Sequence, residues 1–208
     1  MNEKLTLTPA NLTLRHPELG TGPVPTDIYW QPEYYQRELD AIFKRAWLCV
    51  GRVEQAPKPG DFFQKKIPTF DLSVIVERAK DGKLRAFHNV CQHRGIHVEL
   101  RDHGHCVGFT CPFHGWTYGL DGKLVGVPDQ KAFFNLDKGK LGLHQLPLEI
   151  WEGFVFVNLS AEPPMTLAEF LGEHGRDLEG YPFHRGTAIF EYEGVIDCNW
   201  KCLVDSFC

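Results

Sequence analysis

Two short segments decide the fold of this chain: Cys91-Gln92-His93-Arg94-Gly95 and Cys111-Pro112-Phe113-His114-Gly115-Trp116. Each offers one thiolate and one imidazole, at Cys-x-His spacing in the first segment and Cys-x-x-His spacing in the second. Each is short enough to lie on one tight loop, and the glycine that follows each histidine permits a sharp backbone turn. The pattern therefore predicts two loops that together present four metal ligands.

Mixed pairs of this kind suit a [2Fe–2S] cluster in which two cysteines hold one iron and two histidines hold the other. Imidazole is neutral, so such a cluster accepts an electron more readily than an all-cysteine cluster does. The predicted ligands are Cys91, His93, Cys111 and His114, and the predicted role is one-electron transfer. A tetrahedral zinc site is the competing interpretation, but zinc motifs usually pair Cys with Cys and His with His.

The segment from Asn89 to Trp116 resembles the cluster-binding motif of Rieske non-haem iron oxygenases, the large (α) subunits of aromatic-ring-hydroxylating oxygenases. The Rieske subunits of respiratory complexes carry an extra cysteine in each loop, where this chain has Ile96 and Phe113. Downstream, Asn199-Trp200-Lys201 followed by Asp205-Ser206-Phe207 resembles the start of the oxygenase catalytic domain, with Ser206 in place of the family's asparagine.

The resemblance implies a scheme for electron flow. A reductase, sometimes with a ferredoxin, supplies electrons to the cluster, which passes them to a mononuclear non-haem iron held by two histidines and one carboxylate. That iron activates dioxygen for hydroxylation of an aromatic substrate. In the family its ligands follow the Asn-Trp-Lys segment, so we expect a truncated sequence and assign no catalytic residue to it. The family also implies an α3 or α3β3 assembly, with the edge of His114 facing the neighbouring subunit.

Two other activities stay open at this point. One is a monooxygenase or demethylase of the same family that acts on a quaternary amine or an aryl ether. The other is a Rieske module that transfers electrons and does nothing else. The sequence does not choose among them, because in the family the residues of the substrate pocket lie in the catalytic domain.

Composition narrows the class of protein. The net charge is −5 with both signs interspersed, which argues against nucleic-acid and membrane-surface partners. No apolar run is long enough for a transmembrane helix, and the N-terminus lacks the apolar core of a signal peptide. The seven cysteines, an odd number at irregular spacing, indicate a reducing compartment, and we expect the cytoplasm.

The remaining pattern predicts a mostly β protein. An apolar stripe at helical spacing follows Pro32 and includes Trp47. Short strands with tight turns at Asp81-Gly82 and Asp121-Gly122 then indicate an antiparallel β domain. The resemblance implies that this is the Rieske domain and that the beginning of an α+β catalytic domain follows it. The expected strands are 61–66, 72–78, 84–89, 106–110, 117–120, 123–127, 143–150, 153–159 and 188–196.

We predict three domains along the chain. They are an N-terminal arm and helix (1–47), the Rieske domain (48–160), and a linker helix with the start of the catalytic domain (161–208). Thr166-Leu167-Ala168-Glu169 reads as a capping box that opens the linker helix. Within the Rieske domain we expect Trp116 to shield the cluster and Gly126-Val127-Pro128 to cover it.

Overall fold

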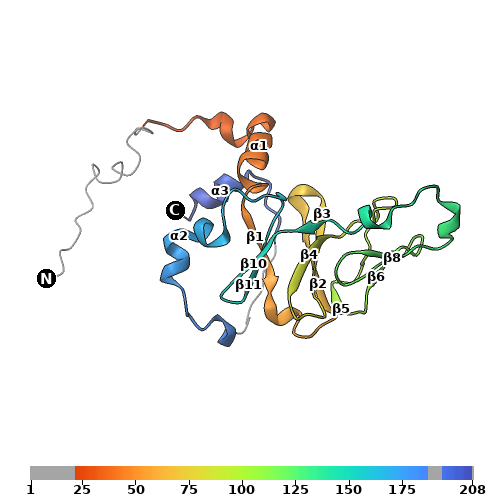
Figure 1. Cartoon of the computed structure of the whole chain (residues 1–208). Helices are drawn as coiled ribbons and strands as arrows, with labels where there is room; N and C mark the ends of the chain where they lie inside the picture. Colours follow the sequence, from red (N-terminus) through yellow and green to blue (C-terminus); the bar gives the residue numbers. More distant parts are fainter. Residues whose placement is uncertain (1–21, 187–193, 208) are drawn as a thin grey trace. The chain divides into compact units, whose positions relative to one another are not determined.

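The computed structural model describes residues 22–186 and 194–207. Within the described residues, which Figure 1 draws in colour, 39–186 form one compact unit, and 22–38 together with 194–207 form another. The domain limits expected from the sequence remain predictions. In the described ranges, no helix has the length and apolar character needed to cross a membrane.

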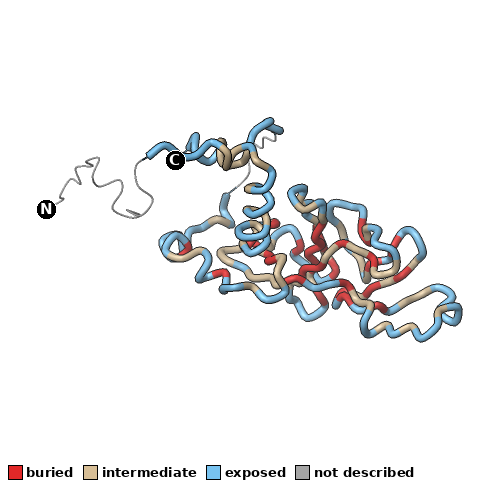
Figure 2. Tube along the Cα trace, turned by 90° about the horizontal axis from the view of Figure 1, so that it is seen from above, coloured by how far each residue is buried: buried red, intermediate tan, exposed pale blue. Residues whose placement is uncertain are grey.

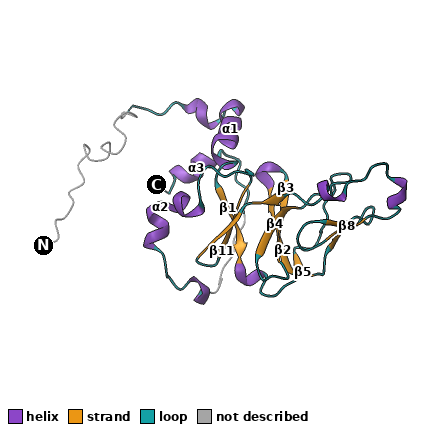
Figure 3. Ribbon diagram, in the orientation of Figure 1, coloured by secondary structure: helices purple, strands orange, loops and turns teal. Residues whose placement is uncertain are grey.

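Three antiparallel sheets make up the larger unit (Figure 3). The largest has five strands in the order β5-β2-β3-β4-β9, and the other two have the orders β1-β11-β10 and β6-β7-β8. This architecture confirms the prediction of a mostly β fold. The strands are β1 (Trp47–Arg52), β2 (Asp61–Ile67), β3 (Leu72–Arg78), β4 (Leu84–His88), β5 (His103–His105), β6 (Phe109–Thr110), β7 (Thr117–Tyr118), β8 (Leu124–Gly126), β9 (Gln145–Leu146), β10 (Leu148–Trp151) and β11 (Phe154–Asn158).

The five-stranded sheet separates two hydrophobic cores. Successive side chains of a strand point to opposite faces, so Phe62 and Phe63 of β2 enter different cores, as do Ile75 and Val76 of β3. Figure 2 shows the buried positions concentrated in the interior of the larger unit. Burial on both faces explains why β3 is an almost continuous apolar run. One core is shared with β1-β11-β10, and the other with β6-β7-β8 and the two predicted ligand loops.

The two predicted hairpin turns are built alike. The Ala79 amide donates to the Lys83 carbonyl, and the Gly119 amide donates to the Lys123 carbonyl, each at 2.9 Å. In each turn the glycine has a positive φ, and the aspartate before it accepts a hydrogen bond from the lysine amide. The Asp-Gly-Lys triplet therefore specifies both turns locally, as the sequence predicts.

The helices agree with the sequence in part. Helix α1 (Pro32–Glu38) continues as a π-helical turn (Leu39–Phe43), but Trp47, expected on the helical stripe, is instead the first residue of β1. The predicted capping box of α2 (Leu167–Asp177) is confirmed, because Thr166 and Glu169 cap each other. Helix α3 covers Trp200–Asp205. The short 3-10 turns are η3 (Thr26–Tyr29), η5 (Val53–Gln55), η6 (Pro68–Phe70), η7 (Gln130–Ala132), η8 (Lys138–Lys140) and η9 (Phe183–Arg185).

Several strands differ from expectation. The run 143–150 divides at Pro147, where the chain leaves β9 of the central sheet and enters β10 of another; a proline, which has no amide proton, is tolerated at that point. Only 109–110 of the expected strand 106–110 are paired, and β5 was not predicted. Of the expected strand 188–196, residues 188–193 lie outside the described residues, and 194–196 form no strand.

A buried acid sits in the core that also holds the ligand loops. Glu77 of β3 is fully buried, and neither carboxylate oxygen has a hydrogen-bond partner among the described residues. Its neighbour across the ladder, Arg85, is committed to Asp81 through two hydrogen bonds. Burial therefore raises the pKa of Glu77 to about 8, with the nearby Arg85 charge opposing that shift.

We expect Glu77→Gln to change how stability depends on pH. Folded Glu77 keeps its proton up to a pH of about 8, whereas in the unfolded chain it ionises near its ordinary value of 4.5. The unfolding free energy of the wild type therefore falls as pH rises across this window, by up to about 1.4 kcal/mol per pH unit. Denaturant unfolding from pH 5 to 8 checks this, with exposed Glu162→Gln as the control. Parallel pH profiles for wild type and Glu77→Gln would contradict it.

Candidate metal centre

The first ligand loop, residues 91–96, is closed by two backbone hydrogen bonds. The Cys91 amide donates to the Ile96 carbonyl at 2.8 Å, and the Gly95 amide donates to the Cys91 carbonyl at 2.9 Å. Gly95 has a φ of 74°, a left-handed conformation that favours glycine. The loop thereby turns back on itself and holds His93 at its centre.

The second loop, residues 111–116, repeats this frame. The Cys111 amide donates to the Trp116 carbonyl at 2.8 Å, the Gly115 amide donates to the Cys111 carbonyl at 3.0 Å, and Gly115 has a φ of 70°. A Cβ atom on Gly115 would lie 3.1 Å from Cγ of Pro128. The loop 126–128 therefore packs on the second ligand loop, and its role in covering the cluster stays a prediction.

The two loops bring their ligand candidates together. Cys91 and Cys111 are both buried in the same core, and the rings of His93 and His114 meet edge to face with centroids 4.7 Å apart. Across residues 22–186 and 194–207, no three His, Cys, Asp or Glu side chains converge as a single-ion site requires. A cluster with two irons needs two separate pairs of ligands, and four donors on two loops supply two pairs.

The surroundings of His93 are typical of a metal ligand. Its Nδ1 atom is buried and has no hydrogen-bond partner among the described residues, although buried polar atoms are nearly always satisfied. Burial lowers the pKa of His93, and the neighbouring His114 and Arg94 lower it further, which favours the neutral ring that binds a metal. The donors present therefore fit the predicted cluster.

The two histidines have different surroundings. Trp116 stacks on His93 at a centroid distance of 4.8 Å, and Phe133 approaches the same ring edge to face at 5.9 Å. His114 is exposed, with its ring 3.9 Å from that of Phe113. Trp116 thus shields the histidine of the opposite loop rather than its own. His93 is thus half-buried against aromatic rings, whereas His114 is exposed.

Tyr118 is a site residue that the sequence did not single out. Its buried hydroxyl accepts a hydrogen bond from the Gln92 amide at 3.0 Å and lies 3.3 Å from Sγ of Cys91. Because the Tyr118 oxygen accepts from the Gln92 amide through a lone pair, the hydroxyl proton is left to donate to Sγ of Cys91. Burial and the Cys91 contact both raise the pKa of Tyr118, so the hydroxyl keeps this proton.

The side-chain amide of Asn89 holds together the chain segments before and after the first ligand loop. Its side-chain oxygen accepts from the amides of Val98 and Glu99, and its side-chain nitrogen donates to the Glu99 carbonyl at 2.8 Å. The residue is fully buried. A single side-chain amide thus ties the residue after β4 to residues 98–99, which follow the first ligand loop.

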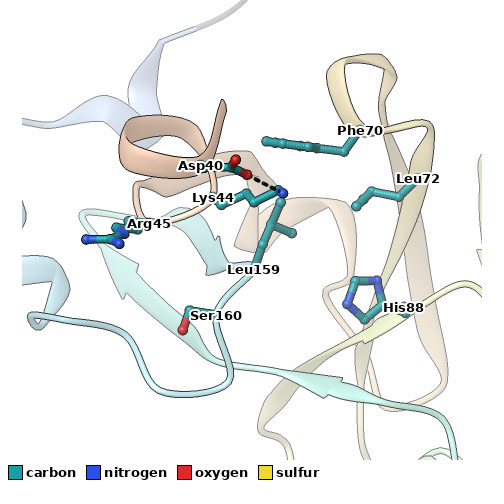
Figure 4. Close-up of a pocket in the computed structure, with 8 residues that line it drawn as sticks. All are labelled: Asp40, Lys44, Arg45, Phe70, Leu72, His88, Leu159 and Ser160. Carbon is teal, nitrogen blue, oxygen red and sulfur yellow. Dashed lines mark hydrogen bonds and ion pairs between the residues drawn. The ribbon is translucent and has the colours of Figure 1, made fainter. Parts of the chain in front are cut away.

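Away from the loops, His88 lines a pocket of about 530 Å³ between the π-helical turn and the central sheet (Figure 4). Phe70, Leu72 and Leu159 contribute apolar side chains to the lining, and Lys44 and Asp40 of the same helical turn form an ion pair at 2.6 Å. No predicted cluster ligand lines it. The lining residues are Asp40, Lys44, Arg45, Phe70, Leu72, His88, Leu159 and Ser160.

Comparison with known proteins agrees with this geometry. Residues 46–147 match the Rieske [2Fe-2S] domain. The chain contains a Rieske [2Fe-2S] domain. It is 37% identical over 194 residues to the biphenyl 2,3-dioxygenase α subunit of Rhodococcus jostii (strain RHA1). The aligned residues cover 90% of this chain and 41% of that relative. The resemblance to Rieske oxygenase large subunits is thereby confirmed, and the chain spans about two fifths of the length of such relatives.

Solved structures show the same fold. Naphthalene 1,2-dioxygenase from Rhodococcus sp. superposes with a TM-score of 0.68 at 32% identity, covering 74% of this chain and 35% of that one. The quaternary ammonium Rieske monooxygenase CntA superposes with a TM-score of 0.68 at 31% identity, covering 74% and 42%. Dioxygenases and monooxygenases therefore share the Rieske domain seen here.

Replacing Tyr118 by phenylalanine tests the hydrogen bond to Cys91. Removing the hydroxyl takes away a donor that stabilises the more negative, reduced state of the Rieske centre, so the reduction potential should fall by roughly 30–60 mV. Redox titration of the purified protein measures the change. Tyr181→Phe, at an exposed tyrosine, is the matched control. An unchanged potential in Tyr118→Phe would count against the assigned bond.

The two loop glycines give a matched pair of substitutions. Gly95→Ala and Gly115→Ala should each cost about 1 kcal/mol for the left-handed backbone. Gly115→Ala should cost more, because its methyl group meets Pro128, whereas a methyl group on Gly95 meets no protein atom within 4 Å. Thermal unfolding should rank the wild type above Gly95→Ala and Gly95→Ala above Gly115→Ala. The opposite order of the two variants would refute the packing of 126–128 on the second loop.

Proposed function

We propose that Cys91, His93, Cys111 and His114 hold the [2Fe–2S] cluster, and that the whole protein is the large subunit of an oxygenase that hydroxylates an aromatic substrate. One observation carries the ligand assignment. Two loops with the same hydrogen-bond frame bury both thiols and leave Nδ1 of His93 without a protein partner. The similarity to dioxygenase α subunits supports the activity.

The different surroundings of the two histidines indicate where electrons pass to or from the cluster. When bound, a cluster of this type supplies one-electron transfer. Trp116 and Phe133 exclude water from the side of His93, while His114 opens to the surface beside Phe113. We assign the exposed edge of His114 as the point where electrons enter or leave. Arg94 lies over the Phe113 ring and adds a positive charge to this face.

The proposed partners follow from the homologues. Rieske oxygenase components work with reductase and ferredoxin systems, and we propose the same for this protein. We also propose an α3 or α3β3 ring in which His114 faces the neighbouring subunit, and a reducing, cytoplasmic setting that suits the six described cysteines, none of which forms a disulfide. The mononuclear iron is assigned to no described residue.

A second candidate is oxygenation of a quaternary amine. It is favoured by the similarity to the quaternary ammonium monooxygenase CntA. Turnover assays of the full-length protein with reductase separate the two candidates. A cis-diol or phenol from an aromatic substrate supports the first, and consumption of a trimethylammonium substrate supports the second.

His114→Cys tests the ligand assignment. The added thiolate places negative charge on the histidine-held iron, so the potential should fall by more than about 100 mV towards that of all-cysteine clusters. Redox titration and EPR spectroscopy of anaerobically purified protein provide the measurement. His103→Cys introduces the same side chain at an exposed strand and should leave the potential unchanged.

Two results would overturn the proposal. One is a wild-type protein that contains neither iron nor inorganic sulfide after anaerobic purification. The other is a His114→Cys protein with a Rieske-type signal at the wild-type potential, because that would show that His114 does not bind the cluster.

A further inference from the structure

One carboxylate joins two distant parts of the sequence within the smaller unit. Glu38, the last residue of α1, accepts a hydrogen bond from Nε1 of Trp200 at 2.9 Å through Oε2. Its other oxygen, Oε1, accepts from Nζ of Lys201 at 2.5 Å. Both oxygens are therefore engaged by adjacent residues at the start of α3.

This ion pair is largely removed from water. The side chains of Glu38 and Lys201 are 15% and 14% exposed. Burial by itself would raise the pKa of Glu38, but the hydrogen bonds from Lys201 and Trp200 hold it below its ordinary value, so the carboxylate stays charged. Loss of one partner would leave the other charge buried and unpaired, which is far more costly than loss of an exposed ion pair.

Further contacts tie α3 to the same N-terminal segment. The Tyr29 hydroxyl donates to Oδ2 of Asp205 at 2.6 Å, at the last residue of α3. Nζ of Lys201 also lies 5.7 Å from the centre of the Tyr29 ring. Six residues are too few for a helix that is stable alone. The N-terminal segment therefore holds α3 at its start and at its end.

We propose that Glu38 is the positioning residue for the Asn199-Trp200-Lys201 segment. Asn199 caps α3 by accepting a hydrogen bond from the Lys201 amide. Glu38, from α1, accepts hydrogen bonds from the side chains of Trp200 and Lys201. This inference rests on the proposed function, in which the chain beyond α3 belongs to the catalytic domain. Glu38 then sets where the chain enters that domain relative to α1.

Hydrogen exchange of the 208-residue chain tests the contact directly. In Glu38→Ala and Lys201→Met, amides of residues 200–205 should exchange at least about tenfold faster. Glu38→Gln should fall between these and the wild type, because its amide oxygen still accepts from Trp200. The charge-swapped double variant, Glu38→Lys with Lys201→Glu, should recover part of the protection of these amides against exchange. Glu33→Gln, exposed on the same helix, should match the wild type.

The cluster provides an independent reference signal. Its proposed ligands lie in the other unit, so visible absorption and the Rieske EPR signal should be the same in every variant. In the full-length oxygenase, Glu38→Ala should lower the content of mononuclear iron and kcat several-fold, with Rieske iron and sulfide unchanged. A general loss of folding would instead lower both metal contents together.

The outcomes separate the two proposals. Wild-type hydrogen-exchange rates in Glu38→Ala, or no recovered protection in the charge-swapped double variant, would overturn the role of Glu38. Undiminished mononuclear iron and kcat in full-length Glu38→Ala would overturn its effect on the catalytic domain. A wild-type protein without a cluster would overturn the proposed function, and the exchange experiment would still decide whether Glu38 holds α3.

Discussion

Each ligand loop closes on itself through two backbone hydrogen bonds around a glycine in the left-handed conformation, and the rest of the site depends on this closure. The cysteine supplies both its amide and its carbonyl to the loop, so the thiol is fixed by the same atoms that shape the turn. The two loops have the same length although the histidine stands two positions after the cysteine in one and three in the other. Backbone geometry, rather than identical spacing, makes the two halves of the site alike.

The loops stay in place because they grow out of a doubly buried sheet. The core that holds Cys91 and Cys111 also contains Phe62, Ile75 and Phe87 from the central strands. Close packing of this kind resists small displacements of the side chains. With the proposed ligands, each loop would contribute one donor to each iron, so a shift of one loop would change the surroundings of both irons.

Buried polar groups divide into two kinds in this core. Asn89 and Tyr118 have their hydrogen bonds satisfied and connect the ligand loops to the strands. Glu77 has none among the described residues, because its nearest cation is paired with Asp81. The satisfied groups specify the loop geometry, and the unsatisfied one makes the stability of the domain sensitive to pH.

The sequence by itself determined the β character, the two Asp-Gly turns, the capping box of α2 and the identity of the four candidate ligands. All of these depend on residues close together in the chain, where spacing and side-chain chemistry are sufficient. The division of 143–150 at Pro147, the pairing of β5 with β2 and the strand position of Trp47 were decided by which sheet each segment joins. The tertiary structure alone placed Trp116 on His93, the Tyr118 hydroxyl beside Cys91, and Glu38 against Trp200 and Lys201. These contacts join residues from different loops or distant helices, and their energy exists only when long-range packing has brought the partners together.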